Sequence, residues 1–153
     1  MVNRPRLYLI DGSSYIFRAF YAIRHLSNSK GLPTNATYGF TQMLLKVLKD
    51  HRPDYLIVVF DSKAPTFRTQ VYQEYKANRP AMPERLVPQI PYIKKIMEAY
   101  RIPTLEIEGY EADDVIGAIA RRAEQAGVEV VIVSSDKDMM QLVSDHVAML
   151  NPA

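Results

Sequence analysis

The chain has 153 residues, of which 48% are hydrophobic and 24% are charged, a composition typical of one folded domain with a sizeable core. It contains no cysteine, which excludes disulfides and thiolate metal sites, and its formal net charge of +2 is too small to indicate a nucleic-acid partner by itself. No apolar run is long enough to span a membrane and the N-terminus lacks a secretory signal, so we expect a cytoplasmic protein without membrane contact.

Short apolar or β-branched runs alternate with segments of helical periodicity. We predict strands at 6–11, 54–61 and 128–136, a further short strand near 103–105, and helices at about 13–23, 37–50, 84–100 and 112–126. Gly127 stands where the cap that ends the last of these helices is expected. Strands separated by helices predict an α/β fold, with a largely parallel central sheet and helices on both faces.

Residues 62–83 do not fit this alternation. They contain three prolines, four basic residues and three aromatic residues, without an apolar period. A connection of this length is unusual in a compact domain, so we expect a mobile, exposed loop or a partly helical arch. Exposed basic side chains often serve solubility alone, but alternating rings and cations also suit a single-stranded nucleic acid, whose bases stack on rings.

Acidic residues stand at the ends of the predicted strands and at the start of one predicted helix. They are Asp11, Asp61, Asp136, Asp138, Glu111, Asp113 and Asp114. Taken singly, such acids are often turn residues or helix caps, because a helix start favours negative charge. Ligand sites of open α/β sheets lie beyond the carboxyl ends of the strands, so we expect the seven carboxylates to converge there if the segment before residue 111 reaches that edge.

Clustered carboxylates repel one another unless cations lie between them. A site of oxygen ligands without histidine or cysteine favours Mg²⁺ or Mn²⁺, and a pair of such ions can catalyse phosphodiester hydrolysis. We interpret the scattered His25, His51 and His146 as structural. Arg18 follows Asp11 on the predicted helix and is expected near the same edge, either as a phosphate contact or as an ordinary surface residue.

Six motifs occur in a fixed order: "LIDGSSYIFRAFYA", "ATYGF", "VVFDSKAPTFR", "YKANRPAMP", "EADDVIGAIA" and "SSDKDMMQLV". From about Leu7 to the last residue, the chain resembles the N-terminal 5′-nuclease domain of bacterial DNA polymerase I, a relative of flap endonucleases and PIN-like nucleases. The resemblance implies divalent-metal-dependent cleavage at 5′ ends and 5′ flaps of DNA and at RNA primers paired with DNA, in replication and repair. It also implies a nucleoid-associated location and no small-molecule cofactor.

The resemblance further implies residue roles. The seven acids correspond to the metal ligands for two Mg²⁺ or Mn²⁺ ions, and Lys76 and Arg79 correspond to catalytic contacts with the scissile phosphate. The residues that correspond to nucleic-acid contacts are Arg18, Phe67, Arg68, Tyr75, Lys76 and Arg79.

Nothing in the sequence resembles the two further metal-site aspartates, the helix–three-turn–helix region or the polymerase domains that follow in the family. We therefore expect residues 1–153 to be the metal-binding part of a 5′-nuclease domain, with an arch near 62–83, one well-formed metal site and impaired activity. The alternatives are a chain that binds metal or DNA without cleaving it and a metal-dependent phosphatase, which would not need the arch. No oligomer is predicted.

Overall fold

The computed structural model describes residues 3–62 and 82–152. Its centre is a five-stranded sheet in the order β3-β2-β1-β4-β5, in which every neighbouring pair is parallel. The strands are β1 (Arg6–Asp11), β2 (Tyr55–Phe60), β3 (Thr104–Glu106), β4 (Glu129–Val133) and β5 (Val147–Leu150). The predicted parallel α/β sheet is confirmed. The strand predicted at 128–136 ends three residues early, and β5 was not predicted.

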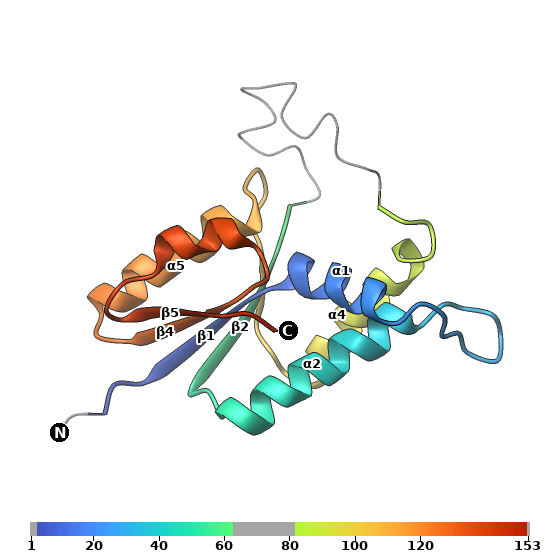
Figure 1. Ribbon diagram of the computed structural model, residues 1–153, viewed down its shortest axis with the longest axis horizontal. Coiled ribbons are helices and arrows are strands. Elements are labelled where there is room, and N and C mark those ends of the chain that lie inside the picture. The colour runs from blue at the N-terminus through green and yellow to red at the C-terminus, as the bar shows by residue number, and fades with distance from the viewer. Residues whose placement is uncertain (1–2, 63–81, 153) are drawn as a thin grey trace.

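Helices cover both faces of the sheet (Figure 1). On one face lie α1 (Gly12–Ala22), α2 (Asn35–His51) and α4 (Ile90–Ala99), and on the other lies α5 (Ala112–Gln125). The helix predicted at 84–100 is divided, because a 3₁₀ helix, η1 (Val87–Gln89), precedes α4. A second 3₁₀ helix, η2 (Lys137–Leu142), follows β4 and was not predicted. Among the helices of the described residues, none is long and apolar enough to cross a lipid bilayer.

Alternating side chains of the central strands form two cores, one on each face. Tyr8 and Ile10 of β1 pack with Phe40 of α2 on one face, whereas Leu9 packs with Ile116 of α5 on the other. Because both faces are covered, the inner strands read as continuous apolar runs rather than as alternating ones.

Two contacts fix the helices on the first face. Gly39 of α2 lies so close to α1 that an added Cβ would be 2.9 Å from the Cβ of Ala19. The amide of the fully buried Gln89 donates from Nε2 to Asn35 Oδ1 (2.8 Å), and its Oε1 accepts from the backbone N–H of Thr37 (2.9 Å). These contacts set α1 and η1 against the start of α2.

The parallel pairing places the carboxyl ends of all five strands at one edge of the sheet. β3 pairs with β2 in parallel, so the segment after Glu106 leads from this edge directly to the start of α5. The segment before residue 111 therefore reaches this edge, as the predicted convergence of the acids requires. The chain order reverses between β1 and β4, and such a switch point is where open α/β sheets place their ligands.

Candidate metal centre

Asp11 ends β1 and is also the N-cap of α1. Its Oδ1 accepts a hydrogen bond from the backbone N–H of Ser14 (3.3 Å), and its Oδ2 accepts one from the hydroxyl of Ser134 (2.9 Å). The side chain is buried, and this burial raises the pKa of Asp11 to about 6, against the two hydrogen bonds and with the help of the charges of Asp61 and Asp136. Capping a helix therefore does not offset the cost of ionising Asp11.

Asp61 follows β2 and caps a different helix. Its Oδ1 accepts from the backbone N–H of Ala112, the first residue of α5, at 2.8 Å. Glu111 occupies the N-cap position of α5, but its side chain makes no capping hydrogen bond and is buried. The acid that caps α5 thus comes from the sheet rather than from the residue that precedes the helix.

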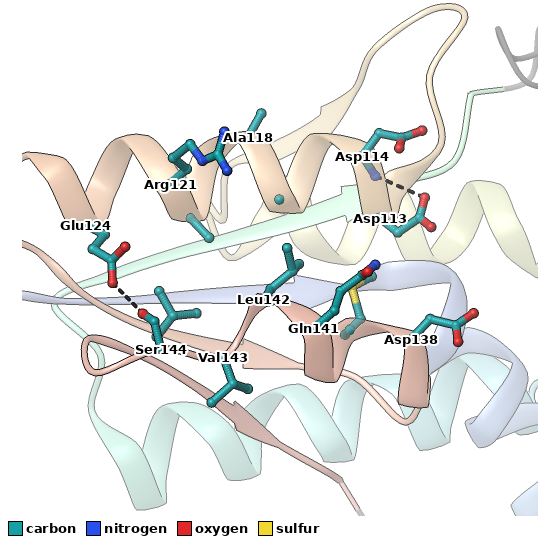
Figure 2. A pocket seen from close by; sticks show the side chains of 14 residues that line it. Asp113, Asp114, Ala118, Arg121, Glu124, Asp138, Gln141, Leu142, Val143 and Ser144 are labelled. Atoms are coloured by element: carbon teal, nitrogen blue, oxygen red, sulfur yellow. Dashed lines mark hydrogen bonds between the residues drawn. The ribbon is translucent and has the colours of Figure 1, made fainter.

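Three acids cluster at the start of α5. Glu111, Asp113 and Asp114 each have a carboxylate oxygen within 4.8 Å of those of the other two. Asp113 Oδ1 accepts from the backbone N–H of Asp114 (2.9 Å; Figure 2). A helix start stabilises each charge by about 0.3–1 kcal/mol. Two like charges about 4 Å apart repel by roughly 1 kcal/mol in water and by about 4 kcal/mol at an effective dielectric constant of 20.

The donor chemistry of this cluster fits a hard divalent cation. Its ligand atoms are carboxylate oxygens only, the type that Mg²⁺ and Mn²⁺ prefer, and a divalent cation between them would offset their mutual repulsion. The residues present therefore suit the kind of ion that the sequence predicted.

Asp136 and Asp138 lie in the turn after β4. Asp136 is the N-cap of η2, and its Oδ1 accepts from the backbone N–H of Asp138 (2.9 Å). Asp138 shares with Asp113 and Asp114 the lining of a groove of about 430 Å³ between α5 and η2. Figure 2 shows these three acids at the same end of the groove. Asp138, from the turn after β4, thus lies in the same groove as two acids from the start of α5.

The hydroxyl of Ser134 connects two of these acids, and the sequence analysis missed it together with the neighbouring pair Ser14 and Ser135. Ser134 bonds to Asp11, as described above, and its Oγ also accepts from the backbone N–H of Asp136 (3.0 Å). The hydroxyl of Ser14 lies 2.6 Å from that of Ser135 and accepts from the backbone N–H of Ser135 (3.2 Å). The sequence feature that could have identified Ser134 and Ser135 is "SSD", in which two small hydroxyl residues stand between an apolar strand and an acid.

Arg18 lies on α1 near the same edge, as predicted. It lines a shallow hollow of about 490 Å³ together with Phe17, Tyr21 and Ser135. Its contact with phosphate remains a prediction. The other predicted nucleic-acid contacts, and with them the arch, lie outside the described residues: Phe67, Arg68, Tyr75, Lys76 and Arg79.

Two of the three histidines take part in contacts away from the acids. The Nδ1 atom of His51 lies 3.2 Å from the hydroxyl of Tyr8, and the Nδ1 atom of His146 lies 2.6 Å from Glu129 Oε1. His51 ends α2 shortly before β2, and His146 directly precedes β5. Both therefore lie at the amino end of the sheet, opposite the acids, where a structural role fits.

Comparison with known proteins identifies the family. Residues 6–153 match the family model described as "5′-3′ exonuclease, N-terminal resolvase-like domain". The chain belongs to this family. It is 52% identical over 146 residues to a 5′-3′ exonuclease of Aquifex aeolicus, a match that covers 95% of this chain and 50% of that protein. It is 49% identical over 146 residues to DNA polymerase I of Bacillus caldotenax, covering 95% of this chain and 17% of that protein.

The fold also matches solved nuclease structures. A bacteriophage T5 flap endonuclease, solved as a pseudo-enzyme-product complex with DNA and metal ions, has a TM-score of 0.70 and 26% sequence identity. The match covers 95% of this chain and 54% of that chain. The resemblance inferred from the six motifs is confirmed, and the chain spans about half the length of these two nucleases and a smaller part of the polymerase.

Proposed function

We propose that this chain is the metal-binding part of a nuclease that hydrolyses phosphodiester bonds at 5′ ends and 5′ flaps of DNA and at RNA primers. The observation that carries the proposal is the meeting of acids from β1, β2, β4 and α5 at one edge of the sheet. The names of the relatives support it, as does the flap endonuclease solved with DNA and metal ions.

In this proposal Mg²⁺ or Mn²⁺ binds to the carboxylates. The ligands are Asp11, Asp61, Glu111, Asp113, Asp114, Asp136 and Asp138. When bound, such ions activate water and stabilise the leaving oxygen of a phosphodiester. The protein's own contribution is to bury Asp11 and to fix the orientation of Asp61 and Asp136 through backbone hydrogen bonds.

The basic segment supplies the contacts with the nucleic acid. Between residues 62 and 79 the sequence has four basic residues and one acidic residue, so its net charge is +3. We propose that Lys76 and Arg79 contact the scissile phosphate. The strand that leads to this phosphate is bound by Phe67, Arg68 and Tyr75 of the same segment and by Arg18 of α1.

The test is incision of an oligonucleotide that carries a 5′ flap, at saturating protein, with Mg²⁺, with Mn²⁺ or with EDTA. We expect cleavage only with metal. Asp113→Asn should abolish it, whereas the matched variant Asp145→Asn, at an exposed acid between η2 and β5, should not. Hydrolysis of p-nitrophenyl phosphate without incision of the flap would instead indicate a phosphatase. Flap binding without incision would indicate a binding protein, and either result would overturn the proposal.

A further inference from the structure

Ser134 joins two acids that come from different strands. The residue follows the last position of β4, and its side chain is fully buried. Its hydroxyl donates to Asp11 Oδ2 at 2.9 Å and accepts from the backbone N–H of Asp136 at 3.0 Å. β1 and β4 are neighbours in the sheet, and the chain order reverses between them. One hydroxyl therefore connects the acids on the two sides of the switch point.

These two hydrogen bonds determine the orientation of the hydroxyl. A serine has one O–H donor, and here that donor is directed at the buried carboxylate of Asp11. The same oxygen accepts from the backbone N–H of Asp136, so a movement of the Asp11 carboxylate or of the Asp136 backbone strains the hydrogen bond to the other. In the absence of the hydroxyl, Asp11 keeps the hydrogen bond from Ser14, and Asp136 keeps the one from Asp138, but the hydrogen-bonded bridge through Ser134 is lost.

We propose that Ser134 is a positioning residue that holds Asp11 and Asp136 at the separation needed by a divalent cation. The inference rests on the proposed function in one respect, that these carboxylates bind such a cation. Mg²⁺ requires nearly ideal octahedral geometry, whereas Ca²⁺ accepts six to eight oxygens in flexible geometry. Loss of a residue that orients the ligands should therefore weaken the binding of Mg²⁺ much more than that of Ca²⁺.

The neighbouring serine offers a matched control. Ser135 is the same residue type, one position further along the turn, and its hydroxyl lies 2.6 Å from the hydroxyl of Ser14. Among the described residues, no hydrogen bond joins Ser135 to a carboxylate, and Ser135→Ala removes the same single atom as Ser134→Ala. A difference between the two variants therefore reports the link between Asp11 and Asp136 rather than the loss of any hydroxyl.

The experiment is calorimetric titration of Mg²⁺ and of Ca²⁺ into the parent chain and into three variants, each checked for folding by circular dichroism. Ser134→Ala should lower the affinity for Mg²⁺ by about tenfold or more, within the range typical for partners of metal ligands, and the affinity for Ca²⁺ by only about threefold. Ser134→Thr keeps the hydroxyl and should restore most of the Mg²⁺ affinity. Ser135→Ala should stay within about twofold of the parent for both ions.

Unchanged Mg²⁺ affinity in Ser134→Ala would overturn the inference, and so would equal losses for the two ions, because general loosening does not discriminate between them. Alanine adds no atoms, so the ratio of the two affinities decides the question even if the extra methyl of threonine disturbs packing. A parent chain that binds neither ion would overturn the metal site of the proposed function itself. That failure is distinguishable from the others, because it appears without any substitution.

Discussion

Asp11→Asn should stabilise the metal-free protein. Raising the pKa of a carboxyl group from 3.8 to about 6 makes its ionised form less favourable in the folded state by about 3 kcal/mol. Asparagine has nearly the same shape, keeps an oxygen that accepts from the backbone N–H of Ser14, and carries no charge to desolvate, although its amide nitrogen cannot accept the hydrogen bond that Ser134 donates to Asp11. At pH 8 we therefore expect the free energy of unfolding to rise by up to about 3 kcal/mol. For a chain of this size, this corresponds to a melting temperature higher by about 6–12 °C.

The pH dependence follows from the direction of the same pKa change. Because the pKa of Asp11 is higher in the folded state, the folded protein binds a proton that the unfolded chain does not hold between pH 6 and pH 4. The cost of ionised Asp11 is fully present above pH 6 and disappears as the pH falls towards 4. The advantage of Asp11→Asn should thus shrink to roughly half of its pH 8 value at pH 5.

The assay is urea unfolding in EDTA at pH 8 and pH 5, followed by circular dichroism. Asp145→Asn, at an exposed site, is the control and should change stability by less than about 0.5 kcal/mol at either pH. If Asp11→Asn were less stable than the parent at pH 8, the carboxylate would be a structural cap, and the reasoning from burial would be refuted.

Four further predictions follow from the packing and from the proposed site. Gly39→Ala should destabilise the fold by about 1–3 kcal/mol in urea unfolding, because the new Cβ would meet Ala19 at 2.9 Å. Gln89→Leu should cost about 1–3 kcal/mol for each buried partner left unsatisfied, and an unchanged unfolding midpoint would contradict this. Mg²⁺ at about 100 times its dissociation constant should stabilise the parent by about 2.7 kcal/mol in thermal melts, and Asp113→Asn should lose this gain. Lys76→Ala should lower the single-turnover rate of flap cleavage far more than flap affinity, and equal losses would make it a simple phosphate tether.

Strands could be predicted from the sequence where burial imposes a clear pattern of apolar residues. The inner strands β1 and β2 are buried on both faces and read as short apolar runs. β5 has only four residues and lies at the edge of the sheet, so neither its length nor its pattern distinguished it from a loop. β4 ends at Val133, and the backbone N–H of the next residue, Ser134, still donates to the carbonyl oxygen of Leu150 (3.1 Å), whereas its hydroxyl donates to Asp11. This contact spans 123 positions and has no local signal.

The placement of the strand-end acids at one edge of the sheet also followed from the sequence, because parallel strands place their carboxyl ends there. The division of tasks among the acids did not. Sequence position indicated that Glu111 or its neighbours would cap α5, whereas the cap comes from Asp61, 51 positions earlier. The partner of a helix N–H depends on which strand end lies beside the helix, and only the packed sheet determines that.

Capping and metal binding are not exclusive roles for these carboxylates. An ionised carboxylate has about four acceptor sites, so one hydrogen bond to a helix N-terminus leaves capacity for a cation. The hydrogen bonds from Ser14 to Asp11 and from Ala112 to Asp61 also restrict the side-chain rotamers, and this restriction orients the remaining oxygens before any ion arrives. A helix cap, however, favours the ionised form of an acid, whereas burial without a neighbouring cation disfavours that form. The pKa of Asp11 is raised because burial outweighs two hydrogen bonds, which agrees with the ligand role proposed for this residue.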